Sequence, residues 1–293
     1  MFKFTPRPLV DWLLRRKAAL ADTPTDRFQV RLARTLEEYE AAFRLVHVAY
    51  VYTGIESIRA PELHMVSQHF LPESYVLLVY DQEQLVGTAT VNLDSPAGLP
   101  LDADYPAEIN DMRQQRCRLV EWGAFAVMER YRHQGVSNLL YMAACSVSTR
   151  MLHASHVVIG INPKAVPFYR AVHGFNMLGK AKPHATLAAP VAGMVMEVTQ
   201  VRAFLRRHYR RPMADGLLPA EHFFGAPLDC IKLPYSLPEA DRARWKMPRQ
   251  VFQALASRRS DVVAAMNPAA VGHLLQSRSR MTLKLGVSTL TDS

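Results

Sequence analysis

The feature that most constrains the fold is an apolar strand followed by a basic turn and then by a second apolar stretch. Residues 117–127 read CRLVEWGAFAV, which is typical of a buried strand. Residues 130–137 form the turn, and residues 138–152 have the apolar spacing and length of a helix. A strand that runs through a tight turn into a helix predicts a sheet covered by helices, in an α/β or α+β layered domain.

Further strands and helices are predicted on both sides of this segment. Alternating or short apolar runs indicate strands over residues 27–33, 74–80, 84–93, 157–161 and 194–198. Helical spacing indicates helices over residues 8–17, 35–50, 61–70, 163–173 and 201–211, and a mostly helical stretch, broken by prolines, over 240–290. Thr35 is expected to begin its helix with a capping box completed by Glu38. Gly174 is expected to end the helix over 163–173.

These elements divide the chain into three parts. Between residues 27 and 200 their order is β, α, α, β, β, β, α, β, α, β, which predicts a three-layer domain on a mixed sheet. Residues 1–26 are expected to form a short amphipathic helix that docks on the protein or lies on a membrane. Residues 201–293 are expected to form a basic, mostly helical extension and not an independent domain.

The net charge of +9 at pH 7 is concentrated in the last third of the chain. Residues 200–293 hold 15 Lys and Arg against 7 Asp and Glu, whereas residues 1–199 hold 20 against 19. Such a field favours an acidic partner: an acidic protein, an anionic membrane surface or a nucleic acid. A solvated basic face without a partner is the alternative.

The sequence offers no pattern for a metal, a disulfide or a membrane span. The cysteines Cys117, Cys145 and Cys230 are widely scattered and form no CxxC pair, so we expect reduced thiols in a cytoplasmic protein. His153 and His156 have no third ligand beside them and are expected to be structural. Charged residues interrupt the first 21 positions, and no stretch approaches the roughly 20 apolar residues of a membrane span.

The basic turn before the helix has the character of a phosphate site. A glycine at the start of a helix leaves backbone N–H groups free, and the positive end of the helix dipole adds to their attraction for an anion. The residues expected to hold the phosphate are Arg132, Gln134, Gly135, Val136 and Ser137. Such a turn on its own is weak evidence.

A second motif makes the assignment specific. It follows the strand over 157–161 and consists of Asn162, Ala165, Phe168, Tyr169, Gly174 and Phe175. Together, residues 132–137 and this motif resemble the R/Q-x-x-G-x-G/A loop and the N-x-x-A-x-x-F-Y…G-F signature of the GNAT superfamily of acyltransferases. The resemblance covers residues 27–200, and Ser137 departs from it because the family has Gly or Ala there.

The resemblance implies a fold and a co-substrate. In that superfamily the fourth and fifth strands splay apart, and the pantetheine arm of an acyl thioester inserts between them. The backbone of Phe125, Ala126 and Val127 is then expected to pair with the pantetheine amides, and Asn162 to belong to the same site. No permanently bound cofactor is implied. The side chain of Ser137 narrows the approach to a pyrophosphate, which favours a carrier-bound pantetheine with its single phosphate over the nucleotide of CoA.

Two residues are expected to carry the chemistry. Glu121 is a lone carboxylate in an apolar strand, where burial should raise its pKa into the range of a general base. It is expected to accept the proton of the attacking amine; an inward salt bridge to Arg118 or Arg132 is the structural alternative. The resemblance implies that Tyr169 protonates the leaving thiolate, although a half-buried core tyrosine would also suit its position.

One branch of the superfamily fits best. The strand over 120–127 resembles the E-x-x-x-(L/F)-A-V pattern of the long-chain N-acyl amino acid synthases of the FeeM type and of the related acyl-homoserine-lactone synthases. This implies transfer of a fatty acyl group from acyl carrier protein, or from acyl-CoA, to the amine of an amino acid. Candidates to line an acyl tunnel are Leu140, Met142, Val158 and Met194, which would equally suit a plain core.

Two other functions remain open from the sequence. One is an acetyl-CoA-dependent N-acetyltransferase that acts on a small amine or on a protein lysine. The other is a non-catalytic GNAT-like module that binds a polyanion through its basic tail, although no nucleic acid is expected. Contact with the inner face of a membrane is a further option, and the sequence identifies neither the amine nor the acyl length.

Overall fold

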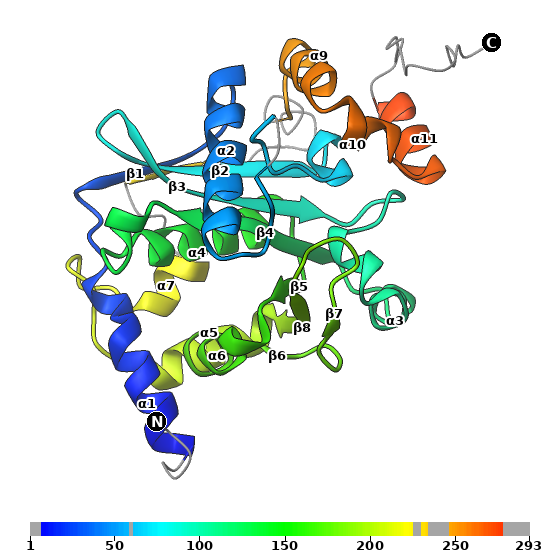
Figure 1. Ribbon diagram of the computed structural model, residues 1–293. Helices are drawn as coiled ribbons and strands as arrows, with labels where there is room; N and C mark the ends of the chain where they lie inside the picture. The colour runs from blue at the N-terminus through cyan, green and yellow to red at the C-terminus, as the bar shows by residue number, and fades with distance from the viewer. Residues whose placement is uncertain (1–6, 59–60, 225–229, 234–245, 278–293) are drawn as a thin grey trace.

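A hairpin of two long apolar strands forms the centre of the sheet. β2 (Ser74–Asp81) and β3 (Gln84–Leu93) pair antiparallel, and their β-branched and aliphatic residues suit strands buried on both faces. The computed structural model describes residues 7–58, 61–224, 230–233 and 246–277. Within these residues, helices cover the sheet on both sides (Figure 1).

The sheet is mixed, as the sequence predicts, and most of its strand pairs are antiparallel. Its other strands are β1 (Phe28–Leu32), β4 (Leu119–Val127), β5 (His156–Ile161), β6 (Asn176–Met177), β7 (Lys182–Pro183), β8 (Pro190–Glu197) and β9 (Ile231–Lys232). The order across the sheet is β6-β8-β5-β4-β3-β2-β1-β9, with β7 paired to β8. Only the pairs β4–β5 and β1–β9 are parallel among these neighbours.

Each face of the sheet has its own layer of helices. The first layer consists of α4 (Val136–Ser146), α5 (Val166–His173), α6 (Val198–His208) and α7 (Pro219–Phe224). The second consists of α2 (Leu36–Tyr52), α3 (Pro106–Gln114), α9 (Arg249–Arg258), α10 (Ser260–Ala264) and α11 (Pro268–Ser277). We call the two sides the α4 face and the α2 face.

The fourth and fifth strands part where the superfamily resemblance implies it. β4 and β5 are paired from Leu119 opposite His156 to Trp122 opposite Ile159, and the ladder ends there. Beyond this point, residues 123–127 of β4 remain paired with β3 while β5 follows β8. A bulge at Ala124, whose φ is 45°, marks the same place and turns β4 away.

Local sequence signals explain where two of the helices begin and end. Thr35 and Glu38 form the expected capping box at the start of α2. Gly174 follows α5 in the left-handed conformation, with φ at 75°, as expected of a residue that ends a helix. The helix expected over 138–152 begins at Val136, and its last turn over Val147–Met151 is π-helical.

Two expectations for the second helical layer are wrong. Residues 61–70 form no helix except a single 3₁₀ turn at Ser67–Phe70, because the His64 N–H donates to the Phe43 carbonyl of α2 instead of bonding within its own segment. Conversely, α3 lies in a stretch rich in Pro, Asp and Ala for which the sequence predicts neither a helix nor a strand. Pro106 occupies its first turn, where a missing N–H costs nothing.

The first described helix packs on the central domain. α1 (Arg7–Ala18) lies against α5, and Arg15 Nη1 donates to the Ala171 carbonyl at 3.2 Å (Figure 1). The helices α9 to α11 agree with the expected helical tail, although residues 240–245 and 278–290 of that expectation lie outside the described part. α7 and β9 were not anticipated in the proline-rich stretch, and β9 extends the sheet beside β1. None of the described helices is long and apolar enough to cross a membrane.

Candidate active site

Glu121 lies on β4 one residue before the strands part, and its side chain is on the α2 face. It is 5% exposed, and its Oε2 accepts a hydrogen bond of 2.8 Å from the Leu101 N–H. The pKa of Glu121 is raised to about 8. Burial is the main cause, and the negative charges of Asp102 and Asp104 act in the same direction, whereas the hydrogen bond from Leu101 lowers the pKa. The carboxyl group therefore exchanges its proton near neutral pH, as a general base requires.

The alternative of a salt bridge at Glu121 is not observed among the described residues. Arg118 donates through Nε to the Leu152 carbonyl. The guanidinium of Arg132 lies over the ring of Tyr52, with its carbon 5.3 Å from the ring centre. Glu121 is thus a carboxyl group kept from water with one backbone donor as its partner.

Tyr50 of α2 belongs to this site, although the sequence showed it only as one position on a helical face. Burial raises the pKa of Tyr50 to about 12, and the charges of Tyr169, Glu56 and Glu121 raise it further. Its hydroxyl group is therefore within electrostatic reach of both expected catalytic residues. No signal in the sequence links Tyr50 to Glu121, because the fold alone brings α2 across the end of β4.

Next to Tyr50, His47 and His64 both contact the buried carboxylate of Glu56. Oε2 of Glu56 lies 3.2 Å from Nδ1 of His47 and 3.2 Å from Nδ1 of His64. The ring of His64 in turn lies 4.7 Å from the ring of Tyr50. This arrangement fixes the position of Tyr50 on the α2 face.

Tyr169 lies on α5 on the α4 face, within a group of aromatic rings. Its ring is 6.0 Å from that of Tyr141, and Tyr141 stacks on Phe125 at 5.1 Å. Burial raises the pKa of Tyr169, and the neighbouring Tyr141 hydroxyl partly opposes this. Tyr169 is therefore protonated at neutral pH and has a hydrogen to donate.

The edge of β4 that faces the gap between the strands is open to a ligand. Phe125, Ala126 and Val127 lie beyond the end of the β4–β5 ladder, and β4 pairs there only with β3. Val46 of α2 packs against Ala126, while Phe125 faces Tyr141 on the opposite side. Among the described residues, the backbone groups on the β5 side of this edge have no hydrogen-bond partner, so they can pair with the amides of an extended ligand.

The turn before α4 has the geometry of an anion site. Gly135 has φ at 82°, and the first intrahelical bond runs from the Leu139 N–H to the Gly135 carbonyl. Within the described residues, the N–H groups of Val136 and Ser137 have no acceptor. Free donors at the positive end of a helix suit a phosphate.

The side chains of this turn have separate roles. The amide of Gln134 bridges Arg27 and the Arg130 carbonyl, so it shapes the turn. Val136 is buried against Gly87, and Ser137 is half-buried. Arg132 is half-buried over Tyr52, near enough to the turn to neutralise an anion there.

Asn162 has a structural role that accounts for its place in the motif. Its Oδ1 accepts the Lys164 N–H at 3.0 Å and so caps the 3₁₀ turn Pro163–Ala165. This turn orients α5 and hence Tyr169. Asn162 is exposed, and the structure gives it no contact with Glu121 or Tyr169.

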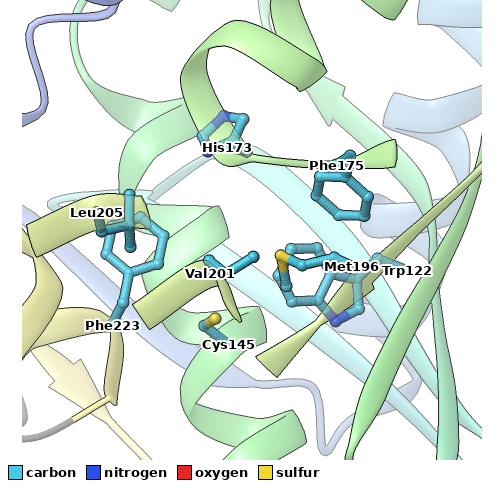
Figure 2. Close-up of a pocket in the computed structure, with 8 residues that line it drawn as sticks. All are labelled: Trp122, Cys145, His173, Phe175, Met196, Val201, Leu205 and Phe223. Carbon is cyan, nitrogen blue, oxygen red and sulfur yellow. The ribbon is translucent and has the colours of Figure 1, made fainter. Parts of the chain in front are cut away.

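A small apolar cavity with a volume of about 10 Å³ lies on the α4 face (Figure 2). Its lining residues are Trp122, Cys145, His173, Phe175, Met196, Val201, Leu205 and Phe223. Burial lowers the pKa of His173 to about 3 and raises that of the Cys145 thiol, so both are uncharged at neutral pH. The cavity has room for about one water molecule and not for an acyl chain.

The residues that the sequence suggested for an acyl tunnel do not line this cavity. Val158 lies on the α2 face, in the cluster around Tyr105. Leu140, Met142 and Met194 are on the α4 face and are wholly buried in the core. No group of His, Cys, Asp and Glu in the described part of the chain is arranged to hold a metal ion.

Comparison with known proteins agrees with this geometry. The family model for the N-acyl amino acid synthase FeeM matches residues 41–197. The solved structure of FeeM, an N-acyl amino acid synthase from uncultured soil microbes, is 24% identical, with a TM-score of 0.54 over 60% of this chain and 95% of FeeM. This similarity shows that the chain and FeeM share a fold.

Two synthases of acyl-homoserine lactones also align. LasI is 13% identical over 58% of this chain and 90% of its own, with a TM-score of 0.47. The CoA-dependent BjaI is 17% identical over 74% and 99%, with a TM-score of 0.48. No curated protein matches the sequence. The family match spans more than half of the chain and includes β4, the turn before α4, and α5. The chain is therefore an acyltransferase that belongs to the FeeM family of N-acyl amino acid synthases.

Proposed function

We propose that this acyltransferase moves a long-chain acyl group from a carrier-bound pantetheine thioester to the amine of an amino acid. The observation that carries the proposal is the position of Glu121. A buried carboxyl group with a pKa of about 8 lies where β4 and β5 part, and aromatic rings line the other face of the same strand. An amine and a fatty thioester can thus approach the same point from opposite faces.

In the proposed reaction the thioester carbonyl lies in the gap beside residues 125–127, where backbone N–H groups of β4 polarise it. The amine attacks the carbonyl carbon, the N–C bond forms, and ionised Glu121 takes the proton from nitrogen. The C–S bond then breaks, and the Tyr169 hydroxyl donates its hydrogen to the departing sulfur. No covalent intermediate with the enzyme is required.

Two features favour a carrier protein as the donor. The half-buried Ser137 occupies the position where the superfamily has Gly or Ala, so the loop has less room for a pyrophosphate. Arg130 and Arg132 beside this loop carry positive charge that suits an acidic protein. Acetyl-CoA-dependent acetylation remains the second candidate.

Contact with a membrane is a further part of the proposal. On α1 the side chains of Leu9, Trp12 and Leu13 are 47%, 48% and 40% exposed, and Arg16 lies 5.4 Å from the Trp12 ring. An exposed apolar stripe next to basic residues suits the interface of an anionic bilayer. A fatty product would leave the enzyme there.

The test is a comparison of donors. Purified protein is incubated with palmitoyl-carrier protein, palmitoyl-CoA or acetyl-CoA and a pool of amino acids, and the products are analysed by mass spectrometry. The proposal requires N-palmitoyl amino acids, formed fastest from the carrier protein. Acetylated products alone would assign the chain to the second candidate, and no product from any donor would favour a binding module.

A further inference from the structure

A groove with a volume of about 370 Å³ lies between α1 and the helices α5 and α6. In Figure 1, α1 lies beside these two helices in the lower part of the view. The volume of the groove is within the roughly 300–1,000 Å³ of small-molecule sites. No residue assigned to catalysis or to donor binding lines it. Its lining residues are Arg7, Pro8, Asp11, Arg15, Arg170, Ala171, Phe204 and His208.

The groove carries a net positive charge. Three guanidinium groups, those of Arg7, Arg15 and Arg170, line it against the single carboxylate of Asp11, which leaves a net charge of +2. Burial is the main cause that lowers the pKa of His208, and the charge of Arg15 acts in the same direction, so this ring is uncharged at neutral pH. A groove of this charge attracts an anion.

The guanidinium groups of the groove have no carboxylate partners. Within the described part of the chain, no ion pair involves Arg7, Arg15 or Arg170, although Asp11 lines the same groove. Arg15 is held in place by its hydrogen bond to the Ala171 carbonyl. Nε of Arg170 is buried and has no hydrogen-bond partner among the described residues. Because a buried donor without an acceptor is costly, Arg170 points to a ligand with acceptor oxygens.

The exposed apolar stripe of α1 lies next to the groove. Trp12 follows Pro8 by four residues and precedes Arg15 by three, so these side chains are neighbours on the helix surface. Leu9 and Leu13 continue the stripe away from the groove. A cationic groove beside exposed apolar side chains suits an amphiphile with an anionic head group. A free phosphate or nucleotide would leave the apolar side chains without a role.

We infer that this groove binds the phosphate head group of an anionic membrane phospholipid, with Arg7 and Arg170 as its donors and Trp12 beside its acyl chains. Guanidinium groups suit this role because their paired N–H groups match two oxygens of a phosphate. The inference rests on the membrane contact in the proposed function, and it adds a defined site and a lipid class to that contact. α5 carries both Arg170 and Tyr169, so a lipid in the groove holds the active-site helix at the bilayer, where a fatty product leaves.

The test is calorimetric titration of the full chain with short-chain dihexanoyl phosphatidylglycerol below its micelle concentration, so that no charged surface contributes. Loss of one charge-assisted hydrogen bond weakens binding about tenfold, so Arg170→Gln and Arg7→Gln should each raise the Kd by about this factor. Arg202→Gln is the matched control: Arg202 is exposed on α6 and does not line the groove, so the same loss of charge should leave the Kd unchanged. Dihexanoyl phosphatidylcholine and inorganic phosphate should bind at least tenfold more weakly than the anionic lipid.

Co-sedimentation with phosphatidylcholine vesicles, with and without phosphatidylglycerol, extends the test to a bilayer. Binding should require phosphatidylglycerol and should weaken more in Arg170→Gln than in Arg202→Gln. Equal losses in these two variants would show that only diffuse charge acts and would overturn the inference. Inorganic phosphate that binds as tightly as the lipid would overturn the lipid as the ligand.

A third measurement separates the groove from donor binding. The KM for palmitoyl-carrier protein should be unchanged in Arg170→Gln; a raised KM with unchanged lipid binding would make the groove a protein-docking site and overturn the inference. If Arg170→Gln does not fold, Arg7→Gln, at an exposed position, decides the outcome alone. A wild type that transfers acyl groups but binds no lipid would overturn this inference only. Lipid binding without acyl transfer from any donor would overturn the proposed transfer and leave the lipid site standing.

Discussion

Glu121 and Trp122 are consecutive residues of β4, and their side chains are on opposite faces of the sheet. Glu121 accepts the Leu101 N–H on the α2 face, whereas Trp122 Nε1 donates to Ser148 Oγ at 2.8 Å on the α4 face. The ladder to β5 ends at Trp122. One strand thus separates a buried carboxyl group from the apolar core of the α4 face, at the place where the thioester is proposed to lie.

The first prediction concerns the pH dependence of the reaction. Only ionised Glu121 accepts a proton, and its pKa is raised to about 8, so at pH 7 most of the enzyme carries the inactive, protonated form. We expect kcat/KM to rise with pH through about 8 and then to level off. A profile measured in non-nucleophilic buffers checks this, and a limb that titrates near the ordinary pKa of 4.5 would contradict it.

The same shift has a consequence for stability. A carboxyl group whose pKa is raised by folding binds its proton more tightly in the folded state, so its ionisation destabilises the fold between the unfolded and folded pKa values, here from 4.5 to about 8. Gln at position 121 avoids this cost. We expect Tm of Glu121→Gln minus Tm of the wild type to grow from pH 5 to pH 9. The control Glu83→Gln, on an exposed turn, should show no such trend.

A third prediction tests the donor of the leaving-group proton. Tyr169→Phe removes the hydroxyl but keeps the ring among Tyr141 and Phe175. We expect kcat to fall about 10²-fold, with little change in the donor KM, if the hydroxyl acts on the departing sulfur. Tyr80→Phe, on the half-buried end of β2, serves as the control. A wild-type kcat in Tyr169→Phe would show that the ring has only a packing role.

A fourth prediction concerns donor binding by the turn before α4. It compares a substitution of Gly135 in this turn with the same substitution of Gly216, which has a similar backbone conformation. Gly135 and Gly216 have φ at 82° and 84°, so Ala costs about 1–2 kcal/mol at either position. At Gly135 a Cβ would also lie 2.4 Å from Cδ of Pro24, whereas at Gly216 it meets open space. We expect Gly135→Ala to lose more stability in urea and to raise the donor KM. Equal losses with unchanged KM in both variants would contradict a role for this turn in donor binding.

The sequence predicts those parts of the site that lie within one segment. Gly135 and Ser137 are adjacent to the helix they begin, and Glu121 is an isolated charge in an apolar run, so local chemistry is enough to propose each of them. Tyr169 needed the family resemblance, because an aromatic residue on an amphipathic helix looks like core. The β4–β5 ladder ends at Trp122, and the two strands part there as the resemblance implies.

The parts that the sequence missed depend on packing between distant segments. Tyr50 reaches Glu121 only because α2 crosses the end of β4. Val158 was a candidate for an acyl tunnel or for plain core, and it lies in the core; β5 is buried on both faces, and a strand of that kind gives no alternation to distinguish its sides. The helix α7 lies in a proline-rich stretch and has six residues, too few for helical periodicity to be recognised.

The most direct test of the account is the acyl transfer rate of Glu121→Gln with palmitoyl-carrier protein and the preferred amino acid. Gln has nearly the same shape and can still accept the Leu101 N–H, so the variant should fold and bind the donor while lacking a base. We predict that kcat/KM falls by about 10²–10⁴-fold, while Glu83→Gln keeps the wild-type value. A folded Glu121→Gln enzyme with wild-type activity would contradict the assignment of Glu121 as the general base.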